Sequence, residues 1–206
     1  MFLRRLLLIP VAAALAAGCS PRRVDLPAIG VIPPFALTER DGRTVSRADL
    51  EGRVWIADFI FTRCSGVCPM MTSKMTGLQK SLAERAASGE FPKDRLRLVS
   101  ITVDPDYDTP AVLSAYAREA GADPLRWLFL TGREQDIFDL SQKGFLLAAG
   151  RDEAAAARFG GTALTHSEKF TLVDSRGVVR GYYDSGDAGE MRKLIEDAAA
   201  LAREAA

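Results

Sequence analysis

Two cysteines with three residues between them, Cys64 and Cys68, are the residues of this chain best suited to chemistry. They follow an apolar stretch, 54–61, that is typical of a buried strand, and Pro69 directly after them favours the first turn of a helix. Thiols at such a junction lie near unpaired N–H groups and the positive end of the helix dipole, which favours thiolates. Two thiolates that converge on one ion form a soft site suited to copper(I), whereas the alternative is a structural disulfide.

His166 is the only histidine in the sequence. A single histidine more often has a structural role, but this one comes directly before a predicted strand and after an Ala- and Gly-rich segment. Two thiolates and one imidazole would give a three-coordinate soft site with room for transfer of the metal. We therefore expect His166 to be the third ligand, with a structural role as the alternative.

Other side chains near the cysteines offer weaker candidates. Met71 and Met75 recur at helical spacing and are expected to pack in the core. Met70 is a candidate transient copper ligand, because its sulfur is soft and follows Cys68 closely. Asp58, within the predicted strand, is a candidate buried carboxylate near the sulfurs.

Three aspartates, Asp104, Asp106 and Asp108, follow the next predicted strand and resemble a site for a hard cation. Their spacing lacks the following glycine and the distal glutamate of an EF-hand loop. We expect them to shape a loop before a helix that Thr109 caps and Pro110 begins. An acidic loop beside the cysteines could also help to dock a partner.

The composition indicates one globular domain with additional segments. The chain has 206 residues, of which 48% are hydrophobic, and a formal net charge of zero. Because there is no excess of basic residues, we do not expect nucleic acid as a partner.

The N-terminus is typical of a secretory signal. Arg4 and Arg5 precede an apolar run, 6–17, that is too short for an ordinary transmembrane span. Residues 15–19 resemble the lipobox of bacterial lipoproteins, in which the cut falls before the cysteine and the cysteine is then lipidated. The resemblance implies lipidation of Cys19, and an uncleaved anchor is the alternative.

These features predict three parts of the chain. Residues 1–18 are a lipoprotein-type signal peptide, and 19–34, which contain four prolines, form a lipidated tether. Residues 35–206 form the copper-binding domain. The mature protein is expected to be anchored to the cell membrane by its lipid, with the domain in the periplasm or otherwise outside the cytoplasm, where disulfides and copper are available.

The order of predicted elements indicates an α/β fold. Strands are predicted at 35–38, 43–45, 54–61, 96–103, 126–131, 169–173 and 178–183, helices at 69–88, 110–121, 133–143 and 187–202, and a mobile loop at 148–165, with a helical turn at 153–158. Alternating strands and helices imply a largely parallel sheet. The layout resembles a thioredoxin-like fold with an N-terminal β-hairpin extension and a late β-hairpin. In such a fold, the segment before the late hairpin faces the start of the cysteine-bearing helix.

Three stretches together resemble the Sco/SenC family of copper-delivery proteins: CSGVCP, TVDPDYDTP and THSEKFTLVDSRGVV. The resemblance implies a thioredoxin-like fold and one copper ion bound by Cys64, Cys68 and His166. It also implies help in assembling the dinuclear copper centre of cytochrome c oxidase. The chain differs from many members in having Thr165 before the histidine, where aspartate is frequent, and a lipid in place of a transmembrane helix.

Three functions follow from these features, in decreasing order of support. The first is a copper chaperone for copper(I), and also for copper(II), that is a binding protein rather than an enzyme. Its expected partner is the copper-bearing subunit of cytochrome c oxidase or another copper-receiving protein. The second is a thiol–disulfide oxidoreductase with Cys64 and Cys68 as its redox-active pair and no need of His166. The third, a peroxidase, lacks the expected Pro-x-x-x-Thr-x-x-Cys arrangement before Cys64.

Overall fold

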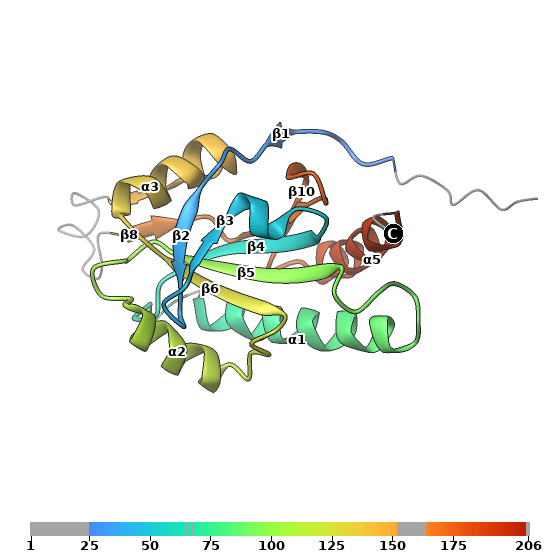
Figure 1. Ribbon diagram of the computed structural model, residues 1–206, viewed down its shortest axis with the longest axis horizontal. Helices are drawn as coiled ribbons and strands as arrows, with labels where there is room; N and C mark the ends of the chain where they lie inside the picture. Colours follow the sequence, from blue (N-terminus) through green and yellow to red (C-terminus); the bar gives the residue numbers. More distant parts are fainter. Residues whose placement is uncertain (1–24, 65, 67, 152–163, 205–206) are drawn as a thin grey trace, which may run out of the picture.

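The computed structural model describes residues 25–64, 66, 68–151 and 164–204 (Figure 1). Within this part, a mixed sheet has the strand order β1-β10-β9-β4-β5-β6-β2-β3. Its strands are β1 (Gly30–Val31), β2 (Ala36–Glu39), β3 (Thr44–Ser46), β4 (Val54–Ile60), β5 (Leu96–Thr102), β6 (Trp127–Thr131), β9 (Lys169–Val173) and β10 (Val178–Asp184). A separate pair of strands consists of β7 (Ala149–Arg151) and β8 (Leu164–His166).

The centre of the sheet is parallel, as predicted. Strand β4 pairs with β5 and β5 pairs with β6 in parallel, whereas β9 joins the other side of β4 antiparallel. Every residue of β4 is buried, because the sheet is covered on both faces. The predicted N-terminal hairpin is β2–β3 and the late hairpin is β9–β10, so both are confirmed.

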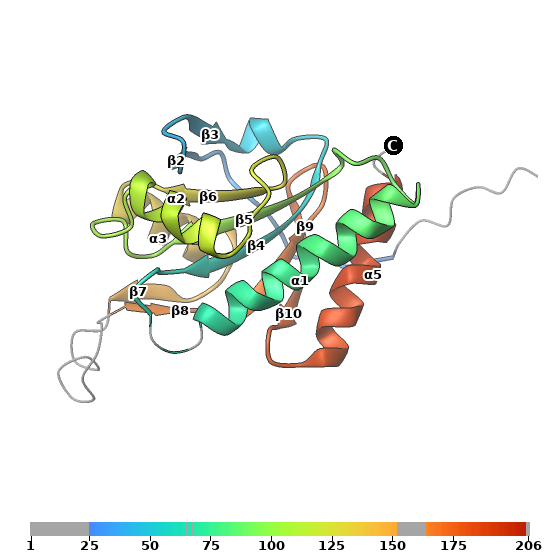
Figure 2. The ribbon, with the colours of Figure 1, turned by 90° about the horizontal axis from the view of Figure 1, so that it is seen from below.

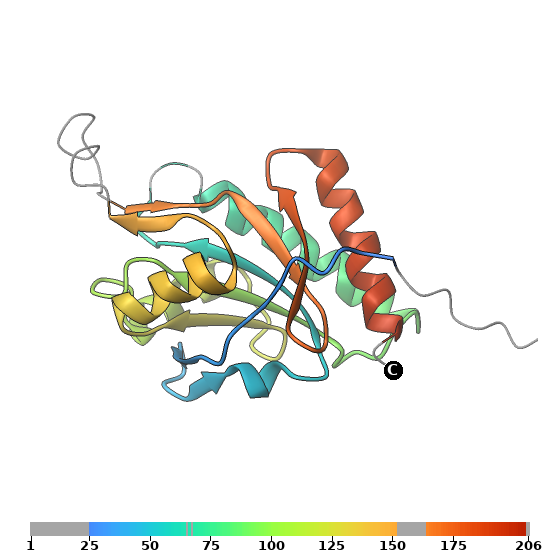
Figure 3. The same cartoon turned by 90° about the horizontal axis from the view of Figure 1, so that it is seen from above.

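The helices are divided between the two faces of the sheet. They are the 3₁₀ helix η1 (Arg47–Leu50), α1 (Cys68–Ala87), α2 (Pro110–Glu119), α3 (Glu134–Asp139), the π-helical turn η2 (Leu140–Gly144) and α5 (Ala188–Glu204). Figures 2 and 3 show α1, α2 and α5 on one face and α3 on the other. None of the helices in the described ranges has the length and apolar content needed to cross a membrane.

Proline and threonine residues mark where helices α1 and α2 begin. Helix α1 begins at Cys68, so Pro69 lies in the first turn, where a missing N–H costs no intrahelical bond. Helix α2 begins at Pro110, and the Thr109 side chain accepts a hydrogen bond from the backbone N–H of Val112 at 3.4 Å. Both helix starts therefore face the carboxyl ends of β4 and β5.

The segment predicted as a mobile loop, 148–165, contains strand β7 and the first two residues of β8. Ala149 pairs with His166 at one end of the β7–β8 ladder, and Arg151 pairs with Leu164 at the other. The loop prediction was wrong for these residues, because Ala and Gly hide the alternation that marks a strand. The helical turn predicted at 153–158 lies outside the described residues.

Two further elements differ from the predicted ones. The helix predicted at 133–143 is α3 followed by the π-helical turn η2. The hydrogen bonds of a π-helix join residues five apart, and a hydrophobic period of 3.6 residues does not predict them. Within the expected tether, Gly30 and Val31 pair with β10, and Ile32 is only 1% exposed. The chain is therefore tied to the sheet from about residue 29, where the Ile29 N–H donates to the Val179 carbonyl.

Candidate metal centre

The structure brings all three predicted ligands together. Cys64 lies in the loop after β4, Cys68 is the first residue of α1, and His166 ends β8. Their ligand atoms all lie within 4.8 Å of one another. Figures 2 and 3 both place β8 beside the first turn of α1. This is the one group of three such residues in the described ranges that could hold a metal ion.

The imidazole of His166 is oriented to bind a metal through Nε2. Its Nδ1 lies 3.0 Å from the Ser167 carbonyl oxygen, which can only accept, so Nδ1 carries the proton and donates. Nε2 then has a free lone pair, and it lies 3.0 Å from Sγ of Cys68. Burial lowers the pKa of His166, which keeps the ring neutral and able to act as a ligand near neutral pH.

Cys68 is a protonated thiol in the metal-free protein. It is only 1% exposed, and burial raises its pKa well above the usual range. We had predicted a thiolate, because the N–H groups and the dipole at the start of a helix stabilise negative charge. At Cys68, the loss of solvent around the sulfur has the larger effect and favours the neutral thiol. The S–H group of Cys68 can thus donate to Nε2 of His166, and a copper ion would take the place of this proton between sulfur and nitrogen.

The two sulfurs differ in their access to solvent. Cys64 is half-buried, whereas Cys68 is buried, and both are free cysteines in the structure. Cys64 is therefore the more accessible of the two sulfurs. The rings of Phe61 and His166 pack edge to face, with centroids 5.6 Å apart and an angle of 84° between their planes.

The loop that carries Cys64 is held by the aspartates after β5. Asp108 accepts hydrogen bonds from the Thr62 N–H at 3.1 Å, from the Thr62 hydroxyl and from the Thr102 hydroxyl. Asp104 forms a bidentate ion pair with Arg63. This clamp fixes the two residues before Cys64, and it confirms the predicted loop role for Asp104 and Asp108.

The clamp also contains residues that the sequence analysis missed. Arg63 stacks over the ring of Tyr107 at 4.8 Å from its centroid, in addition to its ion pair with Asp104. From the sequence, Thr62 and Arg63 were interpreted only as a short polar connection between the strand and the cysteines. Their position directly before Cys64 was the available signal, but their partners lie about forty residues away in the chain.

Replacing Asp108 with alanine is expected to lower the free energy of unfolding by about 2–4 kcal/mol, because the buried Thr102 hydroxyl and two partly buried donors of Thr62 lose a shared acceptor. Denaturant unfolding of the metal-free domain measures this loss. Asp108→Asn is the matched control, since it keeps the volume and one carbonyl oxygen and should cost less. Equal stability of Asp108→Ala and the wild type would contradict the clamp.

The structure also places the other candidate residues near the cysteines. Met71 and Met75 are fully buried, which confirms their core role, whereas Met70 is 40% exposed and its role as a transient ligand stays a prediction. Asp58 is 1% exposed, as expected of a buried carboxylate.

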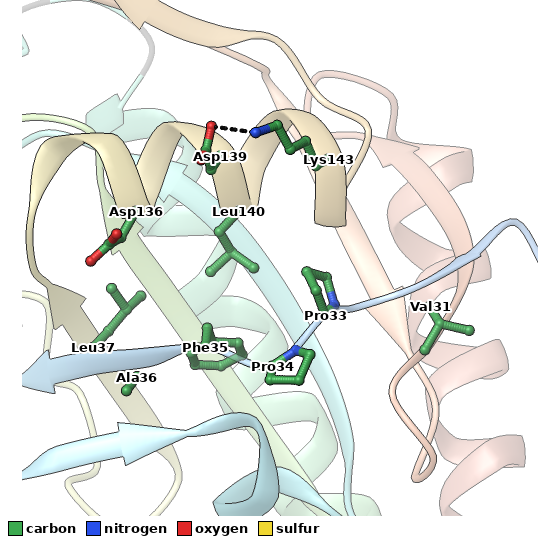
Figure 4. Close-up of a pocket in the computed structure, with 10 residues that line it drawn as sticks. All are labelled: Val31, Pro33, Pro34, Phe35, Ala36, Leu37, Asp136, Asp139, Leu140 and Lys143. Carbon is green, nitrogen blue, oxygen red and sulfur yellow. Dashed lines mark ion pairs between the residues drawn. The ribbon is translucent and has the colours of Figure 1, made fainter.

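A surface pocket of about 480 Å³ lies away from these ligands (Figure 4). It is formed by Val31 and residues 33–37 on one side and by Leu140 on the other, with the Asp139–Lys143 ion pair (3.0 Å) at its rim. None of the three ligand residues lines it. The pocket is therefore not part of the metal centre.

Comparison with known proteins decides the family. A model of the SCO1/SenC family matches residues 26–203. The chain belongs to this family. The SCO1 protein homolog of Bacillus subtilis is 32% identical over 181 residues, which cover 87% of this chain and 87% of that protein.

Solved structures of SCO1/SenC proteins agree. A family lipoprotein from Bacillus anthracis is 33% identical with a TM-score of 0.71, over 84% of this chain and 95% of that one. BsSco, described as a member of the Sco family of cytochrome c oxidase assembly proteins, is 30% identical with a TM-score of 0.70, over 86% and 96%. Copper-bound ScoI from Bradyrhizobium japonicum, 23% identical with a TM-score of 0.64 over 84% and 98%, shares the fold. The predicted family and fold class are confirmed.

Proposed function

We propose that this protein binds one copper ion through Cys64, Cys68 and His166 and delivers it during assembly of cytochrome c oxidase. One observation carries the proposal: the neutral imidazole presents a free nitrogen lone pair 3.0 Å from a buried thiol, with a second sulfur in reach. Copper-bound ScoI and the oxidase-assembly role of BsSco support it.

The ligand set suits copper as a cargo. Thiolates and imidazole are soft to intermediate ligands, which favour copper(I) over hard cations. Three protein ligands leave a position open, so a ligand from the recipient can bind before one from this chain leaves. The half-buried Cys64 lies on the accessible side and is placed to be the first ligand exchanged.

A thiol–disulfide oxidoreductase is the second candidate. Cys64 and Cys68 are close enough for the Cys64 side chain to contribute to the raised pKa of Cys68. That pKa disfavours Cys68 as the attacking thiolate, so the more accessible Cys64 would have to attack. This function does not need His166, which separates the two candidates.

The expected recipient is the copper-bearing subunit of cytochrome c oxidase, or another copper-receiving protein outside the cytoplasm. The expected location is the cell membrane, through a lipid on Cys19, with the domain in the periplasm or an equivalent space. The B. anthracis relative is itself a lipoprotein, which supports this location.

Metal analysis tests the metal assignment. The protein should be exported to the periplasm of a host grown with copper and purified under reducing conditions. We expect one copper per chain, because the three ligands form one site. Purification with zinc in place of copper, or with no metal, would contradict the proposal.

Replacing Cys19 with alanine is expected to abolish lipidation and leave an unprocessed precursor, because the acyl chain is attached through this sulfur. Labelling with a radioactive fatty acid, followed by electrophoresis, measures the effect. The domain should still fold, since the first strand of the sheet begins at Gly30, well after Cys19. Ser20→Ala is the control and should be labelled; normal labelling of Cys19→Ala would refute the lipoprotein assignment.

A further inference from the structure

Three of the six large hydrophobic side chains that are exposed in the described ranges gather around strand β1. They are Ile29, Val31 and Leu146, which are 39%, 63% and 55% exposed, and we call them the β1 patch. Leu146 lies against the strand, because a Cβ placed on Gly30 would be 3.6 Å from the Leu146 Cδ1. Single exposed apolar residues are common, but a group of them marks a surface that contacts something apolar.

The apolar surface extends beyond the β1 patch. Val31 also lines the pocket of Figure 4, which continues with Pro33 and Pro34 on the same stretch of chain and with Leu140 opposite them. Strand β1 pairs only with β10 and so forms an edge of the sheet in the described part of the chain. An apolar edge of this kind is usually covered or made polar, so this one calls for an occupant.

The backbone of Leu146 adds a second, independent observation. Its φ is +54°, and it is the one residue other than glycine with a positive φ in the described ranges. Leu146 directly follows Phe145, the C-cap of η2, at a position that glycine or asparagine usually occupies. The leucine is unfavourable here both in its backbone conformation and in its exposure. Such a cost is typical of a residue that serves a contact outside its own domain.

The chain before β1 places this surface near the expected lipid anchor. Cys19 is six residues before Asp25, the first described residue. Six residues span at most about 22 Å, even when they are fully extended. Arg180 of β10 donates to the Leu26 carbonyl at 2.6 Å, which holds the chain at this end of the domain. A lipid on Cys19 would therefore keep the β1 patch close to the bilayer surface.

The metal centre lies toward the other end of the domain. Figures 2 and 3 show that the chain leaves the domain beside the C-terminal end of α5, whereas β8 and the first turn of α1 lie far from that point. Helix α1 has 20 residues, so it alone extends about 30 Å away from Cys68. A bilayer against β1 would thus leave the metal centre free to meet a recipient.

The charges near the anchor suit phospholipid headgroups. Arg22 and Arg23 lie between Cys19 and the described domain in the sequence. In the turn between β9 and β10, beside β1, the Arg176 side chain is 76% exposed, whereas its partner Asp174 is buried. The carboxylates at the rim of the neighbouring pocket are each paired with a cation. Basic side chains near a membrane surface are attracted to anionic phospholipids.

We propose that the β1 patch docks on the phospholipid bilayer and holds the domain in one orientation, with its metal centre turned away from the bilayer. This inference goes beyond copper binding and rests on the lipid expected on Cys19. Because the anchor keeps the patch within reach of the bilayer, even a small apolar contact is effective. A second copy of the chain is a weaker occupant, since β1 has only two residues and offers few hydrogen bonds for strand pairing.

Photo-crosslinking to lipid tests the proposal on the mature, lipidated protein. The vesicles consist of phosphatidylethanolamine and phosphatidylglycerol, with a phospholipid that carries a diazirine on its acyl chain, and mass spectrometry locates the label on tryptic peptides. We expect label on 144–151, which contains Leu146. We expect none on 119–126, whose exposed Leu125 lies near β6, four strands away from β1. No label on 144–151, or equal label on 194–203 near the end of α5, would overturn the proposal.

Variants of the patch separate docking from anchoring. The double variant Ile29→Thr, Val31→Thr keeps β-branched side chains on β1 and leaves peptide 144–151 unchanged, and it should lower the label on that peptide several-fold. Leu125→Asn removes an exposed leucine elsewhere and should keep the label of the wild type. Leu146→Asn suits the left-handed backbone and should lower the label on β1 without loss of thermal stability. Unchanged label in the double variant and in Leu146→Asn would overturn the proposal.

The remaining outcomes distinguish this proposal from the others. Label on 144–151 that falls as more protein is added per vesicle would show that a second copy covers the β1 patch, and would overturn docking on the bilayer. A mature protein without an acyl chain would overturn both the lipoprotein assignment and this inference. The double variant should bind copper(I) as the wild type does, since it changes no ligand. A wild type that docks but binds no copper(I) would contradict the proposed function alone.

Discussion

Replacing Cys68 with serine is expected to weaken copper(I) binding by more than about 100-fold, because even residues that only support metal ligands contribute 10–100-fold to affinity. Serine keeps the size and hydrogen bonding of the side chain but offers a hard oxygen in place of a soft thiolate. Competition with a copper(I) chelator measures the change on the reduced domain.

Ser73→Ala is the control for this experiment. Ser73 is exposed on the same helix, so its loss changes α1 without touching the ligands. Near-UV circular dichroism of each variant checks that the aromatic core is intact. A Cys68→Ser protein with wild-type copper(I) affinity would contradict a site made of two thiolates.

Replacing His166 with alanine is expected to abolish the copper(II)–thiolate absorption and the ability to support oxidase assembly. The imidazole is the one nitrogen donor of the site, and two thiolates alone leave copper(II) under-coordinated. The Cys64–Cys68 pair should still oxidise and reduce, since His166 contributes no sulfur to exchange. Visible absorption and a thiol assay on the same sample measure the two properties.

Complementation of a deletion strain at limiting copper extends this test to the cell. His166→Ala and Cys68→Ser should both fail to restore oxidase activity. Phe61→Leu is the control and should restore activity, because the Phe61 ring packs against the imidazole but provides no ligand. Wild-type activity of His166→Ala together with loss in Cys68→Ser would favour the oxidoreductase function over copper delivery.

The parts of the site that local sequence determines were predictable. The apolar run of β4 and Pro69 at the start of α1 fix where Cys64 and Cys68 lie. His166 could be named because it is the only histidine and precedes a predicted strand. In each case one short stretch contains both the element and the reactive residue.

The parts that depend on distant contacts were not predictable. His166 reaches Cys68 through the pairing of β8 with β7, whose Ala- and Gly-rich residues gave no strand pattern. The clamp of Asp108 on Thr62 joins two loops that are far apart in sequence. The protonated state of Cys68 follows from its burial, which appears only when the helices pack on the sheet.

X-ray absorption of the copper(I)-loaded domain tests the central claim most directly, because it counts the atoms bound to the metal. The spectrum should fit two sulfurs and one imidazole nitrogen in the wild type, as Cys64, Cys68 and His166 would provide. In His166→Ala the imidazole contribution should vanish while both sulfurs remain. A copper shell without sulfur in the wild type, or an imidazole signal that survives in His166→Ala, would contradict the account.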